Sequence, residues 1–137
     1  MDISKIRDFF YNDKYLVTTG VTIDEVGEDS AICSFEIKDM HMNAANAVQG
    51  GATYTLADSA FAVASNVGHF VRNEKKVSVS QSANITYFKP PKGKKLIAEA
   101  TRISAGKRVS VYSMEVRDDL GTMVALMIGN AYAVDLP

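Results

Sequence analysis

The chain lacks the features that mark several large classes of protein. Its one cysteine, Cys33, forms no internal disulfide, and with no N-terminal signal pattern this predicts a cytoplasmic protein. The two histidines, His41 and His69, lack metal-ligand spacing, so no metal is expected, and we expect His41 to be a surface or loop residue. No apolar run approaches the roughly 20 residues of a membrane span. A formal net charge of −1 gives no electrostatic reason to expect a nucleic acid or an anionic membrane as a partner.

The composition is that of a globular domain, with 47% apolar and 23% charged residues. A length of 137 residues is enough for one domain with a substantial core. We therefore expect a single domain over residues 1–137.

Apart from one long helix, the hydrophobic pattern predicts mainly strands. Residues 2–12 form a short amphipathic helix, and from Leu16 an alternating run predicts a strand that pairs with residues 31–37 as a hairpin. Four more strands follow without an intervening helix, at residues 77–87, 96–104, 108–117 and 122–134. This order predicts an α+β fold with a single antiparallel sheet wrapped around one long buried helix. Because the edges of such a sheet need covering or pairing, it also favours a homo-oligomer.

Residues 42–68 carry a single charged side chain, Asp58, in an otherwise small and apolar segment. Residues 52–67 contain no proline or glycine and are apolar nearly all round, which predicts a buried helix that Gly68 ends, followed by a polar connection at 69–76. A carboxylate is rarely buried, because burial of a charge costs free energy, so its presence in such a helix needs an explanation. We consider Asp58 a candidate catalytic group.

Gly50 and Gly51 stand where this helix begins, so their N–H groups are unpaired and available to a developing oxyanion. At about 1.5 Å rise per residue, Gly50 and Asp58 lie about 12 Å apart along the axis, too far to act on one carbonyl carbon. If both are catalytic, two subunits contribute to the site. Residues 38–48 form a loop that delivers polar side chains such as Asn43 to the start of the helix.

Each of these residues also has a structural explanation. Asp58 could be satisfied by the hydroxyls of Thr55 or Ser59, and the two glycines could simply form a turn. Asn43 could cap its own loop, and Gln49 could be an ordinary hydrogen-bonding residue at the helix start.

The motifs resemble those of the hotdog-fold acyl-CoA thioesterases of the PaaI-like, phenylacetate-pathway type, over residues 16–132. The matching positions are Asn43, Gln49-Gly50-Gly51, Leu56-Ala57-Asp58, Asn84-Ile85-Thr86-Tyr87-Phe88-Lys89-Pro90, Gly106-Lys107-Arg108 and Gly121 with Val124-Ala125. Gln49 is a departure, because the family most often has histidine there. Glutamine can donate a hydrogen bond but does not titrate near neutrality.

The resemblance implies hydrolysis of a small or medium acyl-CoA, aromatic or aliphatic, at a dimer interface. The Gly50 N–H would be the oxyanion donor, and Asp58 of the other subunit the nucleophile or general base, with Asn43 and Gln49 positioning the thioester or the water. The other implied substrate contacts are Gly51, Ser80 and the basic residues Lys89, Lys107 and Arg108, which would bind CoA phosphates.

The resemblance implies no cofactor apart from the CoA of the substrate, and a dimer or a dimer of dimers, that is, a homotetramer. Two alternatives stay open at this point. Hotdog domains also serve as non-catalytic acyl-CoA-binding modules, since a fold does not determine function. A hydratase of the same fold is less favoured, because its usual Asp and His pairing is not recognisable.

Overall fold

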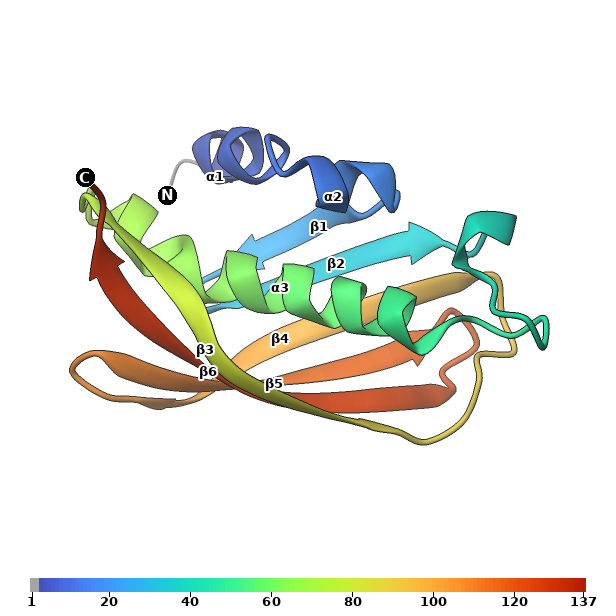
Figure 1. The fold of residues 1–137 in the computed structure, drawn as a ribbon. Helices are drawn as coiled ribbons and strands as arrows, with labels where there is room; N and C mark the ends of the chain where they lie inside the picture. The colour runs from blue at the N-terminus through green and yellow to red at the C-terminus, as the bar shows by residue number, and fades with distance from the viewer. Residues whose placement is uncertain (1–2) are drawn as a thin grey trace.

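The computed structural model describes residues 3–137, and its centre is a six-stranded antiparallel sheet that curves around helix α3 (Figure 1). The strand order is β1-β2-β4-β5-β6-β3. The elements are α1 (Ile3–Phe10), α2 (Lys14–Thr18), β1 (Thr22–Gly27), β2 (Ser30–Glu36), a 3₁₀ turn (Asp39–His41), α3 (Gly50–Val71), β3 (Lys76–Tyr87), β4 (Lys95–Ala105), β5 (Val109–Asp118) and β6 (Met123–Asp135). The predicted single antiparallel sheet around one long helix is confirmed.

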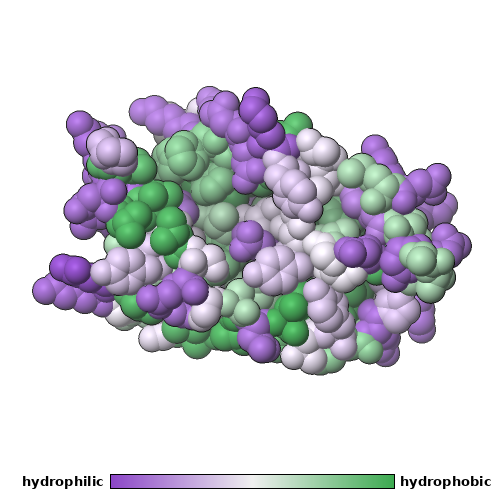
Figure 2. Space-filling model, viewed as in Figure 1, coloured by the Kyte–Doolittle hydropathy of each residue, from purple (hydrophilic) through white to green (hydrophobic). Residues whose placement is uncertain are grey.

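Helix α3 packs one face against the concave side of the sheet. Its inward side chains, among them Leu56, Ala60 and Phe61, are at most 1% exposed. The opposite stripe is open, with Thr55, Asp58 and the later positions of the same face only half buried. In Figure 2 the middle of this side of the molecule is largely white and green around a small hydrophilic group, and more hydrophilic residues lie along its upper edge and toward its two ends. The predicted buried helix is therefore confirmed, with one half-buried stripe on the side away from the sheet.

The C-terminal end of α3 lies beyond the predicted one. The helix continues through Gly68 and His69 to Val71, so residues 69–71 are helical and do not belong to a polar connection. The helix ends at Arg72 and Asn73, and Asn73 has a φ of 52°. Asparagine tolerates this left-handed conformation better than other non-glycine residues, so it ends the helix where glycine was expected to.

The N-terminal region contains a helix that the sequence pattern did not predict. Helix α1 is confirmed, although Asp2, where the predicted helix began, lies outside the described residues. The next segment, Lys14–Thr18, is helical rather than extended. The Asp13 carboxylate accepts a hydrogen bond from the Leu16 N–H at 3.1 Å and caps this short helix. Leu16 is buried because it points into the core from one helical turn.

Strand β3 lies at one edge of the sheet, next to β6, and its side chains do not alternate strictly between the two faces of the sheet. Ser80 pairs with Ala131 and Ser82 with Asn130, so Gln81 is the extra residue of a β-bulge. A bulge exchanges the two faces of a strand. Val79 is therefore 44% exposed, whereas Ile85, beyond the bulge, packs against the core.

Candidate active site

The first turn of α3 presents unpaired backbone donors. The backbone N–H groups of Ala52 and Thr53 both donate to the Gln49 carbonyl, at 2.9 and 3.3 Å. Within residues 3–137, no hydrogen bond accepts the N–H of Gly50 or Gly51, and Gln49 makes no side-chain cap. Together with the positive end of the helix dipole, these two donors form a site suited to an oxyanion.

Tyr87, at the end of β3, lies directly against Gly50. Its hydroxyl donates to the Gly50 carbonyl at 2.9 Å, and a Cβ atom on residue 50 would lie 3.3 Å from the phenol ring. Gly50 therefore allows the close approach. Beside it is an open cavity of about 320 Å³, with largely apolar walls that include Val48, Phe88 and Pro90.

His41 holds the loop before α3 in place. It lies in the connection between β2 and α3, but it is 2% exposed, so the expectation of a surface histidine was wrong. Its Nε2–H donates to the Thr19 carbonyl at 2.7 Å, its Nδ1 accepts from the Lys38 N–H at 3.0 Å, and its ring stacks on Phe35 with centroids 4.0 Å apart. The His41 carbonyl in turn accepts from the Gln49 N–H at 2.8 Å, which connects this histidine to the helix start.

Asn43 and Gln49 both lie exposed near the first turn of α3. The Asn43 side-chain oxygen accepts from the N–H groups of Ala45 and Ala47 at 2.9 and 3.0 Å, so it caps the loop. Its amide NH₂ group makes no hydrogen bond within the described chain. The Gln49 side chain folds over Gly51, where its Oε1 lies 2.5 Å from the position that a Cβ would occupy.

Asp58 lies half-buried on the open stripe of α3 and makes no hydrogen bond to any described residue. The two hydroxyls that could have satisfied it are engaged elsewhere: Thr55 donates to the Gly51 carbonyl at 2.8 Å, and Ser59 donates to the Thr55 carbonyl at 2.7 Å. A hydroxyl has only one proton to donate. Burial, with a smaller contribution from the negative charge of Asp13, raises the pKa of Asp58 above its ordinary value of 3.8.

One chain does not bring Asp58 and the free amides together. Gly50 and Asp58 lie eight residues apart in the same regular helix, so they are about 12 Å apart along its axis. The remaining candidates are also dispersed. Ser80 is exposed next to the bulge of β3, and Lys89 lines the cavity beside Gly50. Lys107 and Arg108 form the β4–β5 turn, at the opposite end of the sheet.

A larger cavity, of about 590 Å³, lies away from these residues. Phe9 of α1, His69 and Phe70 of α3, and Glu74 contribute to its walls, and neither Asp58 nor Gly50 lines it. In residues 3–137 no three His, Cys, Asp or Glu side chains cluster in a way that would hold a metal ion. Over the same residues, no helix is both long and apolar enough to cross a membrane.

Tyr87 and His41 are the site residues that the sequence pattern missed. Tyr87 had a weak signal, because it stands in the matching segment Asn84–Pro90, but no role was expected for it. His41 had none, since its burial depends on Phe35 and Thr19, which lie elsewhere in the chain.

A family model described as Thioesterase superfamily matches residues 45–125, more than half of the chain. The chain therefore belongs to the thioesterase superfamily and has its hotdog fold, which confirms the expectation of a PaaI-like thioester hydrolase at the level of the family.

Individual relatives agree with this assignment. A protein from Archaeoglobus fulgidus named "Putative esterase" is 35% identical over 135 residues, which cover 97% of this chain and 84% of that protein. The acyl-coenzyme A thioesterase PaaI of Escherichia coli is 26% identical, over 91% of this chain and 86% of its own. The structure of a mutant of the phenylacetic acid degradation protein PaaI from Thermus thermophilus superposes with a TM-score of 0.76 at 28% identity, covering 86% of this chain and 96% of that one.

Proposed function

We propose that this protein hydrolyses the thioester of a small or medium acyl-CoA, aromatic or aliphatic, to the free acid and CoA. The observation that carries the proposal is Asp58, a half-buried carboxylate without a hydrogen-bond partner in the described chain, on the helix whose first turn has two free amide donors. Relatives named acyl-coenzyme A thioesterase support acyl-CoA as the substrate class.

In this mechanism the thioester carbonyl oxygen accepts a hydrogen bond from the Gly50 N–H. Asp58 either attacks the carbonyl carbon, so that the C–S bond breaks, CoA leaves and water then hydrolyses the acyl–Asp58 anhydride, or takes a proton from a water molecule that attacks this carbon. In the second case the tetrahedral intermediate expels the CoA sulfur, which receives the proton from Asp58. The raised pKa makes Asp58 a stronger base than an ordinary aspartate.

Two subunits supply these groups. Within one chain, Gly50 and Asp58 are separated by about 12 Å along α3. If two copies of α3 pack antiparallel, each Asp58 faces the Gly50 of the other copy, and the two groups can act on the same carbonyl. The open stripe of α3 and the unpaired edge of β3 lie on the surfaces that such a pair would cover. A dimer, or a dimer of dimers, gives two equivalent sites per pair.

Asn43 and Gln49 orient the reacting groups next to the Gly50 amide. The side-chain NH₂ groups of both residues donate to the thioester or to the attacking water. The cavity of about 320 Å³ next to Gly50 holds the acyl group, and its apolar walls suit an aromatic ring or a short aliphatic chain.

The test is an assay of thiol release from a panel of acyl-CoAs, with the wild type compared with Asp58→Ala. We expect release by the wild type and at least a 10²-fold loss in the variant. If the wild type binds acyl-CoA by calorimetry but releases no thiol from any member, the enzyme proposal is wrong and the protein is an acyl-CoA-binding module.

A mixing experiment tests the two-subunit site. Gly50→Pro removes the amide donor at the first helical position, where proline is tolerated. Gly50→Ala is the matched control, because it adds the same Cβ against Tyr87 but keeps the N–H. Mixing inactive Asp58→Ala with inactive Gly50→Pro should restore up to about a quarter of the activity, through mixed dimers that keep one intact site. An inactive mixture of variants that are shown to exchange subunits would contradict the two-subunit site.

A further inference from the structure

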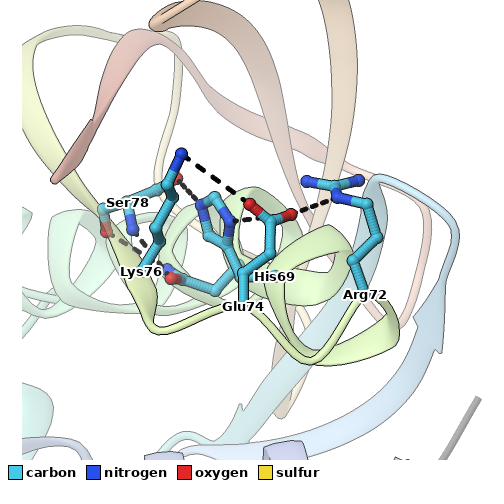
Figure 3. Close-up of polar contacts among 6 residues, drawn as sticks. His69, Arg72, Glu74, Lys76 and Ser78 are labelled. Carbon is cyan, nitrogen blue, oxygen red and sulfur yellow. Dashed lines mark hydrogen bonds and ion pairs between the residues drawn. The ribbon is translucent and has the colours of Figure 1, made fainter. Parts of the chain in front are cut away.

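A buried histidine near the C-terminal end of α3 lies between a serine hydroxyl and a carboxylate, as Figure 3 shows. The Nε2 atom of His69 is 2.9 Å from the hydroxyl oxygen of Ser78, and its Nδ1 atom is 3.9 Å from Oε1 of Glu74. His69 is 8% exposed, and within residues 3–137 its Nδ1 has no hydrogen-bond partner. This cluster is separate from the candidate active site, because His69 lies eleven residues after Asp58, about 16 Å along α3.

The surroundings of His69 determine which of its nitrogen atoms carries the proton. Burial, opposed by the charge of Glu74, lowers the pKa of His69 below its ordinary value of 6.5, so the imidazole is neutral near neutral pH. Its Nδ1 atom faces the Glu74 carboxylate, which accepts hydrogen bonds but cannot donate them when it is ionised. The proton therefore lies on Nδ1, and Nε2 accepts the hydrogen bond that the Ser78 hydroxyl donates.

Two cations keep Glu74 ionised and in place. Its Oε1 accepts a hydrogen bond from the Nε–H of Arg72, and its Oε2 lies 3.9 Å from Nζ of Lys76. The hydrogen bond from Arg72 lowers the pKa of the Glu74 carboxyl below its ordinary value of 4.5. Arg72 itself packs over Gly68, where its Nη1 lies 2.9 Å from the position that a Cβ would occupy. A negative charge therefore stays beside the imidazole.

Asn66, nearly one helical turn before His69, fixes the backbone of Ser78. Its Oδ1 accepts from the Ser78 N–H at 2.8 Å, and its Nδ2 donates to the Ser78 carbonyl at 3.1 Å. Asn66 is 2% exposed. Because Asn66 and His69 are neighbours on the same helix, these bonds keep the serine at a constant distance from the imidazole.

Ser78 and His69 both line a small cavity between α3 and the sheet. Its volume is about 160 Å³, or that of about five water molecules, which is enough for a short acyl group. Arg108 lines the same cavity, and its carbonyl accepts from the N–H of Ala133, the residue of β6 that pairs with Ser78. Its guanidinium makes only a long contact, 3.4 Å, with the Tyr132 hydroxyl. This cation therefore has N–H donors available for a developing oxyanion.

We propose that Ser78, His69 and Glu74 form a second reactive centre, which hydrolyses oxygen esters of short carboxylic acids through an acyl–Ser78 intermediate. A hydroxyl that donates to an imidazole, whose other nitrogen faces a carboxylate, is the arrangement that activates a serine nucleophile. This activity does not use Asp58, so it goes beyond the thioester hydrolysis proposed above and does not depend on it.

The reaction has two steps. The Ser78 Oγ attacks the ester carbonyl carbon while its proton passes to Nε2 of His69. The bond between that carbon and the alcohol oxygen then breaks, and the alcohol leaves with the proton. In the second step a water molecule gives a proton to Nε2 as it attacks the acyl carbon. The acyl–Oγ bond breaks, the acid is released and Ser78 recovers the proton.

Covalent labelling tests the nucleophile directly. Diisopropyl fluorophosphate reacts with an activated serine when Oγ displaces fluoride from phosphorus, and peptide mass spectrometry locates the adduct. We expect an adduct on Ser78 of the native protein, formed at least about 10²-fold more slowly in His69→Gln and roughly 10-fold more slowly in Glu74→Gln. Ser110→Ala is the matched control, because it removes another hydroxyl that lines the same cavity, and it should leave the labelling rate unchanged.

An unlabelled Ser78 in the native protein would overturn the proposal, whatever the variants do. So would equal labelling rates in the wild type and in a His69→Gln variant that keeps the wild-type unfolding midpoint. Either result would make the hydrogen bond between His69 and Ser78 a purely structural contact.

Steady-state assays distinguish this centre from the candidate active site. With 4-nitrophenyl acetate, Ser78→Ala should lose at least about 10²-fold in kcat/KM, whereas Asp58→Asn should stay within about 2-fold of the wild type. With acyl-CoA the two variants should exchange these results. Ester hydrolysis that needs Ser78 in a protein without acyl-CoA activity would support this inference and contradict the proposed function. Ester hydrolysis that survives in Ser78→Ala and is lost in Asp58→Asn would contradict this inference alone.

Discussion

Two aspartates in this protein lie in opposite environments. Asp118, at the end of β5, is 2% exposed and accepts hydrogen bonds from four backbone N–H groups, at 2.7 to 3.0 Å. The donors are Lys92, Gly93, Leu120 and Thr122. Asp58, on the open stripe of α3, makes none within the described chain. Both are aspartates, so the difference between them arises from the donors that the fold directs at each one.

The pKa values of the two groups move in opposite directions. At Asp118, burial opposes ionisation, but the amides of Lys92, Thr122 and Gly93 outweigh it and hold the pKa well below the ordinary value of 3.8. At Asp58, burial without donors raises the pKa. The hydrogen bonds of Asp118 hold two turns together and make it a weaker base. Asp58 has no such hydrogen bonds within the described chain, so it remains basic enough to react with a substrate. Replacing each aspartate by asparagine, which has the same shape, tests this contrast.

Asp58→Asn should give the largest effect, a loss of activity of about 10³-fold or more, because asparagine is neither a nucleophile nor a base. Its free energy of unfolding near neutral pH should equal or exceed that of the wild type, since an unpaired charge has been removed. Thiol release and urea denaturation measure the two quantities. A variant that is both active and less stable would make Asp58 a structural residue.

Asp118→Asn should have the opposite effects, a loss of stability with little change in activity. The new NH₂ group faces backbone donors, so we expect a loss of about 3 kcal/mol in the free energy of unfolding. The kcat per folded molecule should remain near the wild-type value, because this turn does not contact Asp58. Denaturation curves and active-site-normalised rates provide the check.

The pH dependence of stability should separate the two aspartates. Because the pKa of Asp118 is lowered on folding, its stabilisation is complete above about pH 4 and is lost as the pH falls through the folded pKa. Because the pKa of Asp58 is raised, stability decreases as the pH increases from about 3.8 through its folded pKa. Asp118→Asn should reduce the loss of stability in acid, and Asp58→Asn should remove the decrease above pH 4. Identical pH curves for both variants would contradict these assignments.

The smallest effects are expected from the hydroxyls beside Asp58. Thr55→Val and Ser59→Ala remove donors that bond helix carbonyls rather than the carboxylate, so activity should stay within about 3-fold of the wild type. A pH–rate profile is the sensitive measurement. If either substitution shifts the acidic limb of the pH–rate profile to higher pH, the hydroxyl that was removed stabilises ionised Asp58 in the working enzyme.

Local pattern predicted the elements of this fold better than their ends. The alanine-rich run before Val67 predicted α3, and alternation predicted the four long strands, because both signals come from side chains near in sequence. The end of α3 was missed because Gly68 accommodates Arg72 and does not break the helix. The bulge at Gln81 was missed because it depends on the register with β6.

The candidate site shows the same difference between features set by neighbouring residues and features set by distant ones. The order of residues was enough to identify Asp58 as a lone carboxylate among small apolar residues, and Gly50 and Gly51 as the first residues of its helix. Whether Thr55 or Ser59 would satisfy that carboxylate, and whether His41 would be buried, depended on which carbonyls and rings lay within reach. Helical periodicity depends on residues three or four positions apart, so it can be read from the sequence. Hydrogen-bond partners from distant segments come within reach only once the sheet has curved around α3, so they cannot be read from the sequence.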